Sequence, residues 1–315
     1  MTEPIALSVS LKRRKDSMQI SKKWLALGAS VLIMGVGIAY AQNDTAPTGK
    51  GIGTILRRAP SGDQQGPATN AFVLGHGIQY HGGPIMTATK NVYYIWYGNW
   101  SGNTALSILP TLATGLNGSP YFNINTTYTD SHGGVVSNSV ALAGQMFDNY
   151  SHGTSLNDAA IQAIVAAQNP TDTNGVYFVL TSADVNETSG FCTVYCGWHT
   201  HASIGGKDIK YSFVGNADRC PSACSAQNIS PNNNVGADAM ASVISHEQEE
   251  TATDEDLNAW FDRSGAENAD KCAWTFGAEY TVGNGSKANM NLGGLDFLIQ
   301  QNWVNSGRGF CALTH

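Results

Sequence analysis

The sequence predicts a mixed α/β fold, in which one domain over residues 71–315 has a central mixed sheet flanked by helices. Two runs of β-branched and aromatic residues, 92–97 and 176–180, are typical of buried strands. An apolar stripe of helical period precedes the second run and stops at Asn169-Pro170, and an Asn-Gly turn then leads into the strand. This order of helix, turn and strand indicates helices layered on a sheet.

Three further elements follow from local patterns. The helix before the second strand is expected to begin at a capping box in residues 155–158. Residues 209–214 are a third strand candidate. A C-terminal helix is expected from the spacing of Leu295, Leu298, Ile299 and Trp303. No internal repeat or interior linker interrupts the chain, so one domain is the simplest organisation.

The composition is that of a loop-rich protein of low charge. Charged residues make up 13% of the chain, against about 25% in an average soluble protein. Of the 315 residues, 35 are glycine. The formal net charge is −7 and the pI is near 5.5. Nucleic acid and anionic membrane surfaces attract basic patches, so neither is expected as a partner.

The N-terminus has the pattern of a secretory signal peptide over residues 1–41. Lysines and arginines precede an apolar run, and the small-residue site Ala39-Tyr40-Ala41 follows it. A membrane anchor is the alternative, but the apolar run is shorter than the roughly 20 residues of a typical span, so no stable anchor is expected. Residues 42–70 are polar and rich in Gly and Pro, which predicts a flexible leader. The protein is therefore expected to be secreted, to an extracellular or periplasmic location.

Six cysteines follow the predicted cleavage site. An even number in an exported chain favours disulfides, and the proximity of the cysteines suggests the pairs Cys192 with Cys196, Cys220 with Cys224, and Cys272 with Cys311. A structural zinc site with four cysteine ligands is the alternative, because the first four cysteines have the spacing of metal-ligand pairs.

Residues 238–251 form a helix candidate with an unusual motif. Helix formers run throughout, and Asp238 is the expected N-cap. His246, Glu247 and Glu250 continue an apolar stripe, whereas Glu249 lies off it and is expected to face water. Inward-facing carboxylates need a partner or a metal ion. The pattern His-Glu-x-x-Glu differs from the zincin motif only in its last residue, so a zincin-like active helix is expected.

Two acids downstream extend this motif. Glu267 follows Glu250 by 17 residues, a length of chain that can return to the helix. We therefore expect His246, Glu250 and Glu267 to be metal ligands, with Asp270 orienting one of them. Ordinary loop acids are the alternative, since this region is rich in acids.

Motifs such as Gly190-Phe191-Cys192, His246-Glu247 with Glu250, and Glu267 with Asp270 are spread over residues 80–272. These segments resemble the EXORDIUM or phosphate-induced protein 1 family, known from secreted plant proteins. They occur in the family's order, and the family's helix motif is likewise His-Glu-x-x-Glu. The chain departs from the plant pattern at Asp254, in its lead-in and in a shorter segment before Glu267. The matching residues are Tyr80-His81-Gly82-Gly83-Pro84, Ile95-Trp96-Tyr97-Gly98, 176–184, Gly190-Phe191-Cys192, Cys196-Gly197, His199, Val214-Gly215-Asn216, Cys220-Pro221, Cys224, His246-Glu247, Glu250, Asn258-Ala259-Trp260, Glu267, Asp270 and Cys272.

The expected chemistry is metal-assisted hydrolysis of an amide bond. Zn²⁺ is the first choice of metal. Ca²⁺ or Mn²⁺ is the alternative, because carboxylate ligands suit these ions, and a site without metal is the remaining case. Glu247 is the expected base that activates water. His199 is expected to stabilise the oxyanion or to be a further metal ligand, and His201 is a weaker candidate for the same roles.

Two functions from different classes follow. The first is a secreted metal-dependent peptidase or amide hydrolase, with zinc as the first choice of metal, acting on a peptide or protein substrate. The alternative is a non-catalytic extracellular or cell-wall-associated binding protein, with a structural metal or none, whose partner is an extracellular polymer. Hydrolysis of carbohydrate by two carboxylates is a third possibility, which no acid pair in the sequence favours.

Overall fold

A five-stranded mixed sheet forms the centre of the protein. The structure, a computed structural model, describes residues 45–50 and 77–315, so the predicted signal peptide lies outside the described residues. The strand order is β3-β2-β5-β8-β7, in which the first four strands are parallel and β7 runs antiparallel to β8 at one edge. The strands are β2 (Lys90–Tyr97), β3 (Val140–Asp148), β5 (Gly175–Thr181), β7 (Gly197–Ile204) and β8 (Lys207–Val214).

The three predicted strands are confirmed. Each lies in the sheet interior, where both faces are covered, so β2 and β5 carry long apolar runs, whereas β8 also buries Lys210 and Ser212 between apolar residues. Every residue of β5 is buried. The mixed α/β fold predicted from these runs is therefore the fold observed.

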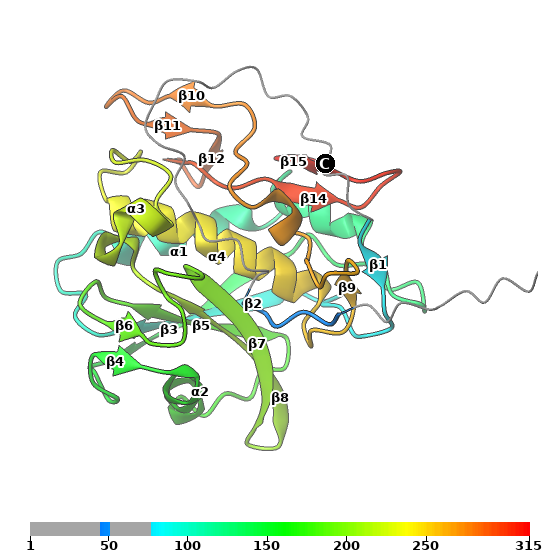
Figure 1. The fold of residues 1–315 in the computed structure, drawn as a ribbon, viewed down its shortest axis with the longest axis horizontal. Helices are drawn as coiled ribbons and strands as arrows, with labels where there is room; N and C mark the ends of the chain where they lie inside the picture. Colours follow the sequence, from blue (N-terminus) through cyan, green and yellow to red (C-terminus); the bar gives the residue numbers. More distant parts are fainter. Residues whose placement is uncertain (1–44, 51–76) are drawn as a thin grey trace, which may run out of the picture. The chain divides into compact units, whose positions relative to one another are not determined.

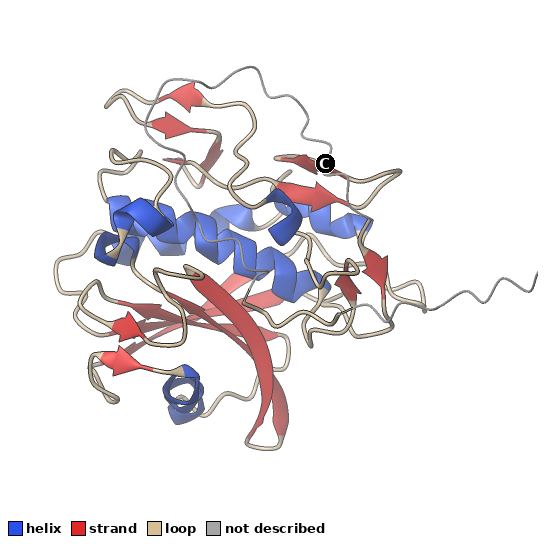
Figure 2. Cartoon of the chain, viewed as in Figure 1, coloured by secondary structure: helices blue, strands red, loops and turns tan. Residues whose placement is uncertain are grey.

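Helices cover both faces of the sheet. Helices α1 (Ala105–Leu116) and α4 (Val235–Thr253) lie on one face, and α2 (Asp158–Ala167) lies on the other (Figures 1 and 2). The predicted cap of α2 is wrong in detail. Ser155 lies in the short strand β4 (Ser155–Leu156), and Asn157 caps the helix by accepting a hydrogen bond from the Ala160 N–H at 2.9 Å.

Helix α4 is buried on all sides, which corrects two expectations. Its N-cap is Asn234, four residues before the predicted N-cap, and Asp238 lies inside the helix. Glu249 was expected to face water but is completely buried, and its Oε2 accepts a hydrogen bond from Asn302 Nδ2 at 2.5 Å. The sheet covers one side of α4 and the C-terminal β-hairpins cover the other (Figure 1), so the helix has no solvent face.

The predicted C-terminal helix is wrong. Its residues form the strands β13 (Leu295–Phe297) and β14 (Asn302–Val304), each paired in a two-stranded sheet. Gly293 and Gly294 have positive φ, which allows the tight turn from β12 (Met290–Leu292) into β13. The apolar spacing of helical period instead arises from two short strands separated by an irregular segment.

Short elements complete the described chain. No helix of the described ranges is long and apolar enough to cross a membrane. The remaining strands are β1 (Gln79–Tyr80), β6 (Asn186–Glu187), β9 (Trp260–Phe261), β10 (Tyr280–Thr281), β11 (Lys287–Ala288) and β15 (Phe310–Ala312); the remaining helices are α3 (Pro221–Cys224) and the 3₁₀ turns η1 (Phe122–Thr127), η2 (Ala217–Arg219) and η3 (Asp270–Cys272).

All six cysteines form disulfides, but two predicted pairs are wrong. Cys192 binds Cys220 and Cys196 binds Cys224, while the predicted pair Cys272 and Cys311 is confirmed. Both cysteines of the segment 192–196 pair with cysteines of the segment 220–224. Two bridges therefore join the loop before β7 to helix α3. Proximity in sequence was misleading because the two segments meet only in the folded chain.

Candidate metal centre

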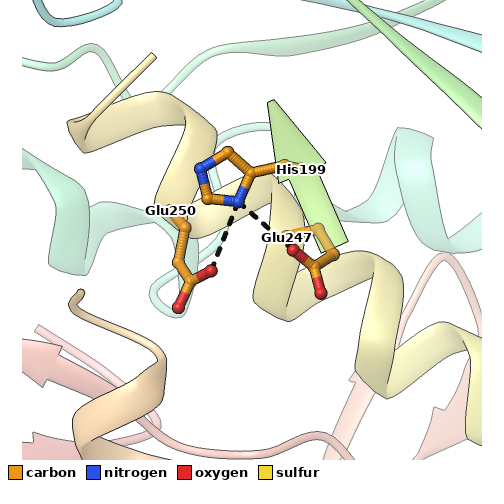
Figure 3. Close-up of side chains that lie close together, drawn as sticks. All are labelled: His199, Glu247 and Glu250. Atoms are coloured by element: carbon orange, nitrogen blue, oxygen red, sulfur yellow. Dashed lines mark hydrogen bonds and ion pairs between the residues drawn. The ribbon is translucent and has the colours of Figure 1, made fainter. Parts of the chain in front are cut away.

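His199 lies at the centre of a buried cluster of acids. It comes from β7, and its side chain points to the helix that carries the His-Glu-x-x-Glu motif (Figure 3). Its Nδ1 lies 3.3 Å from Glu247 Oε2 and 3.4 Å from Glu250 Oε2. The exposed fractions of the three residues are 0%, 4% and 1%. One histidine nitrogen and two carboxylates therefore meet in a space closed to solvent.

Local sequence explains why strand and helix approach so closely. Glu247 and Glu250 are three residues apart, so they lie on the same face of α4. Gly197, two residues before His199, faces the same helix. A Cβ on this glycine would lie 2.6 Å from Val243 Cγ1 and 3.1 Å from Glu247 Oε1. The missing side chain leaves the room in which Glu247 reaches the histidine.

Glu267 approaches the other side of the imidazole. Its Oε1 lies 3.5 Å from His199 Nε2, and neither atom has a hydrogen-bond partner although both are buried. Buried polar atoms without a partner are rare and costly, and in native proteins they often mark a functional site or a place where an ion or water binds. Both ring nitrogens of His199 thus face carboxylates. On the Nε2 side, neither the ring nitrogen nor Glu267 Oε1 makes a hydrogen bond.

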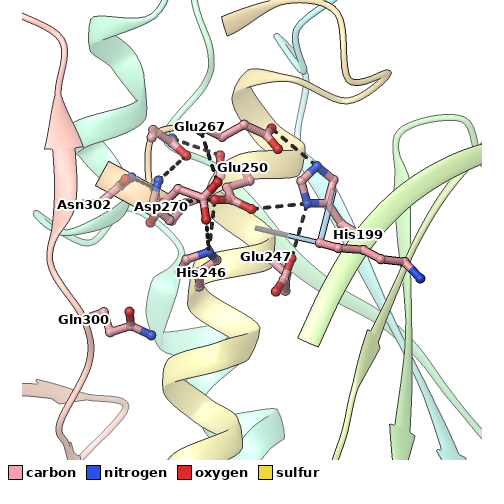
Figure 4. Close-up of polar contacts among 12 residues, drawn as sticks. His199, His246, Glu247, Glu250, Glu267, Asp270, Gln300 and Asn302 are labelled. Atoms are coloured by element: carbon pink, nitrogen blue, oxygen red, sulfur yellow. Dashed lines mark hydrogen bonds and ion pairs between the residues drawn. The ribbon is translucent and has the colours of Figure 1, made fainter. Parts of the chain in front are cut away.

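His246 belongs to a second group that shares Glu250. Its Nε2 lies 3.0 Å from Glu250 Oε1 and 3.6 Å from Asp270 Oδ1 (Figure 4). The backbone N–H of Asp270 also donates to Glu250 Oε1 at 3.0 Å. Glu250 therefore directs one oxygen to His199 and the other to His246, and it joins the two groups.

Burial and charge shift the pKa values of the cluster in opposite directions. Desolvation raises the pKa of Glu247 to about 7. Burial alone would also raise the pKa of Glu250, but the charge of His246 and hydrogen bonds from both histidines lower it to about 2. Burial raises the pKa of Glu267 well above its usual range. The cluster holds four carboxyl groups, Glu247, Glu250, Glu267 and Asp270, and two histidines.

Both histidines are held in the charged form by these acids. Burial alone would lower the pKa of His199, but the charge of Glu267 and the hydrogen-bonding contacts of the ring with the Glu247 and Glu250 carboxylates, which accept, raise it well above its usual value. The pKa of His246 is likewise raised, against desolvation, chiefly by Glu250 and Asp270. A divalent cation would supply the same charge without requiring protons on the rings.

His201 lies in a separate group outside the buried cluster. Its Nδ1 is 2.8 Å from Asp208 Oδ1 and 3.4 Å from Asp256 Oδ1. Lys210 Nζ lies 2.8 Å from Asp208 Oδ2, so a cationic side chain already balances these acids. The structure does not bring His201 to the acids around His199.

The predicted site residues meet, but not in the predicted arrangement. Glu250 contacts both histidines, His246 contacts Asp270 rather than Glu267, and Glu267 faces His199. Asp270 Oδ2 accepts a 3.3 Å hydrogen bond from the backbone N–H of Glu267. The sequence suggested His199 as an oxyanion donor or a further metal ligand but did not place it between the glutamates, because nothing in the local pattern shows which residues of β7 face α4.

One buried residue escaped the sequence analysis. Asp254 lies at the C-terminal end of α4 and accepts hydrogen bonds of 2.6 Å from the backbone N–H groups of Asn258 and Ala259. Burial raises its pKa to about 6 despite these bonds. Its position directly after the helix was the available signal, since aspartate often hydrogen-bonds nearby backbone amides.

Fold and site together define a class: a mixed α/β domain in which a helix and an edge strand enclose a buried cluster of histidines and carboxylates. The family described as the phosphate-induced protein 1 conserved region matches residues 78–293. The chain belongs to this family, as its resemblance indicated.

Plant proteins are among the relatives. The chain is 33% identical to Protein EXORDIUM-like 5 of Arabidopsis thaliana over 272 residues, which cover 72% of this chain and 75% of the relative. It is 31% identical to Protein EXORDIUM-like 3 of the same plant, over 72% and 80% of the two chains. Protein PHOSPHATE-INDUCED 1 of Nicotiana tabacum is 28% identical over 58% and 67%. No solved structure matches the chain.

Proposed function

We propose that this protein is an exported binding domain stabilised by a divalent metal ion at His199, Glu247 and Glu250. One observation carries the proposal. The Nδ1 atom of His199 lies 3.3 Å and 3.4 Å from the two carboxylate oxygens. Ligand atoms bound tetrahedrally to zinc at 2.0–2.1 Å are about 3.3–3.4 Å apart, whereas charge-assisted hydrogen bonds are typically about 2.7–2.9 Å long.

The surrounding contacts support the same ligand set. All three ligand atoms lie within 4.8 Å of one another. Glu267, on the far side of the ring, is placed to accept the Nε2 proton of His199 and thereby to orient the imidazole, as carboxylates do for many metal-bound histidines. His246 holds the second oxygen of Glu250 at 3.0 Å. His199 and Glu250 thus each have a neighbour on the side away from the proposed ion.

The ligand types favour zinc over harder cations. One imidazole and two carboxylates balance the charge of Zn²⁺, and imidazole suits zinc better than Ca²⁺. Mn²⁺ is the second choice, because carboxylate-rich sites accept it. The ligands come from α4 and β7, which are far apart in sequence, so an ion here would hold the helix against the edge of the sheet. Its near-complete burial supports a structural role.

Peptide hydrolysis is the second candidate, and a different group of residues favours it. His246, Glu250 and Asp270 also lie within 4.8 Å of one another. With the ion in this second group, Glu247 is free to act as the base, and His199 lies beside it at 3.3 Å. This arrangement preserves the roles that the His-Glu-x-x-Glu pattern predicts for His246, Glu247 and Glu250, with Asp270 in place of Glu267.

Metal removal tests the proposal. We expect one zinc ion per chain by elemental analysis of the purified protein, and a lower melting temperature after dialysis against EDTA that added zinc restores. A site at 100-fold saturation contributes about 2.7 kcal/mol of stability. A metal-free native protein whose melting temperature responds to neither EDTA nor zinc or manganese contradicts the proposal.

Two variants separate the structural from the catalytic candidate. If the ion is structural, His199→Asn loses it and His246→Asn retains it. If the ion is catalytic, His246→Asn loses it and His199→Asn retains it. The exposed His132→Asn is the matched control. Glu247→Gln adds a second criterion, because it loses the ion in the structural arrangement. In the catalytic one it keeps the ion and loses cleavage of a casein or peptide-library substrate.

A further inference from the structure

A short segment of the same chain lies along the free edge of the central sheet. The sheet ends at β7, so one side of this strand has backbone groups that no other sheet strand pairs. The backbone N–H of His199 points to this side and donates to the carbonyl oxygen of Gly49 at 2.9 Å. Residues 45–50, the blue stretch in Figure 1, thus meet the free edge of β7 through this backbone hydrogen bond, and the segment bends at Gly49 and Lys50.

The contact requires glycine at position 49. Its φ is +68°, a conformation that other residues seldom adopt. A Cβ built there would lie 1.8 Å from the carbonyl oxygen of His199, a distance that no side chain tolerates. The edge of β7 therefore accepts backbone at this point and excludes every side chain.

The next residue, Lys50, enters a pocket suited to a cation. Its Nζ lies 2.6 Å from Asp158 Oδ2 and 3.0 Å from Ser189 Oγ. The same nitrogen lies over the rings of Tyr195 and Trp198, at 5.4 Å and 5.3 Å from their centroids. Carboxylate, hydroxyl and two aromatic faces are the groups that recognise an ammonium ion.

The walls of this pocket are fixed by a second acid. Glu187 is 1% exposed, and its Oε2 accepts the Tyr195 hydroxyl at 2.6 Å. Ser189 Oγ donates to Asp158 Oδ1 at 2.6 Å. Two carboxylates thus surround the site of one lysine. Burial opposes ionisation of Asp158, but hydrogen bonds from Lys50 and Ser189 lower its pKa.

The segment is also held at its other end. The Thr45 N–H donates to the carbonyl of Arg263 at 3.1 Å. The loop that contains Arg263 leads to Glu267, whereas Lys50 contacts α2 and the loop before β7. Residues 45–50 therefore pass from one side of the acid cluster to the other across the backbone of His199.

We propose that the edge of β7 and this pocket form a binding site for peptides that carry a Gly-Lys pair. Residues 45–50 of the same chain fill it in this structure. The contact with the His199 backbone requires glycine, and the acidic and aromatic side chains around Lys50 favour lysine at the next position. The hydrogen bond to the backbone of β7 fixes the orientation of the peptide. The site shares the backbone of His199 with the proposed metal centre, whereas its lysine contacts come from Asp158, Ser189, Tyr195 and Trp198, none of which is a proposed ion ligand.

Peptide binding to a variant with an empty pocket tests the proposal. The variant is Lys50→Ala, and the probe is the hexapeptide Thr-Ala-Pro-Thr-Gly-Lys, measured by calorimetry. We expect it to bind at least tenfold more tightly than the same peptide with norleucine in place of lysine. A peptide with alanine in place of glycine should lose most of the affinity. Wild type and Lys207→Ala, whose pockets stay filled, should bind the peptide more weakly than Lys50→Ala.

A second measurement needs no change in the segment. Trypsin cleaves after lysine, and the contacts of Lys50 should protect that bond in the native protein. Asp158→Asn should accelerate cleavage at Lys50 at least fivefold, as followed by mass spectrometry. Equal affinity for the lysine and norleucine peptides overturns the proposal, as does an unchanged cleavage rate. Peptide affinity and cleavage rate are measured again after EDTA treatment. The preference for lysine can then be judged even if the protein proves to bind no metal.

Discussion

Burial decides the behaviour of single acids in this protein. Glu249 differs from its neighbours in α4 because it faces the C-terminal strands, where Asn302 is its hydrogen-bond donor. Desolvation raises its pKa to about 8. The same residue on a solvated helix would carry a charge at neutral pH and contact only water. Helix periodicity could not reveal this, because it assumes that one face of the helix stays exposed.

Substitutions at Glu249 should separate size and hydrogen bonding from charge. Glu249→Gln keeps the volume and an acceptor for Asn302, so we expect a loss of at most about 1 kcal/mol. Glu249→Ala leaves a cavity and an unpaired buried amide, and we expect a loss of about 2–4 kcal/mol. Urea unfolding followed by fluorescence measures both. Equal losses for the two variants would show that the hydrogen bond between Asn302 and residue 249 does not contribute to the free energy of unfolding.

At the scale of elements, the loop between β9 and η3 positions Glu267. Asp262 holds this loop by accepting the backbone N–H groups of Ser264 and Ala266, and its Oδ2 lies 2.7 Å from Lys271 Nζ. Burial would raise the pKa of Asp262, but the hydrogen bonds from Lys271, Ser264 and Ala266 outweigh it and lower the pKa. The shape of the loop thus depends on an ionised aspartate.

This pKa shift predicts a loss of stability in acid. A carboxyl whose folded pKa lies below its unfolded value contributes stability above the unfolded pKa, near 4, and loses it as the pH falls through the folded pKa. We expect Asp262→Asn to destabilise the protein at pH 6 and to approach wild type below about pH 3. Melting temperatures across this range give the comparison, with Asp296→Asn as a control. A difference between wild type and variant that is constant with pH would refute the assignment.

At the scale of the whole molecule, disulfides join segments that the sheet does not pair. Cys192–Cys220 and Cys196–Cys224 each span 28 residues and connect the loop before β7 to helix α3. Once one of these bridges has formed, the second closes only a short additional loop. Their effects on the entropy of the unfolded chain therefore overlap.

Removal of these bridges should be non-additive. A loop of this length corresponds to about 3–4 kcal/mol of stability when its only bridge is lost. We expect Cys196→Ser with Cys224→Ser to cost about 1–2 kcal/mol, because the neighbouring bridge still closes the loop, and removal of all four sulfurs to cost at least about 3 kcal/mol. Denaturant unfolding of the two variants measures this. Equal costs for the first and second bridge would indicate that each acts on the native state instead.

The sequence by itself determined the family, the mixed α/β class, the three interior strands and the set of residues that form the acid cluster. These signals are local: apolar runs mark covered strands, and a glutamate-rich helix with an inward face marks a site. Only the tertiary structure decided the pairing of Cys192 and Cys196, the burial of Glu249 and the position of His199 between three glutamates. Each of these depends on which distant segment covers a helix or strand, and that choice arises from packing over the whole chain.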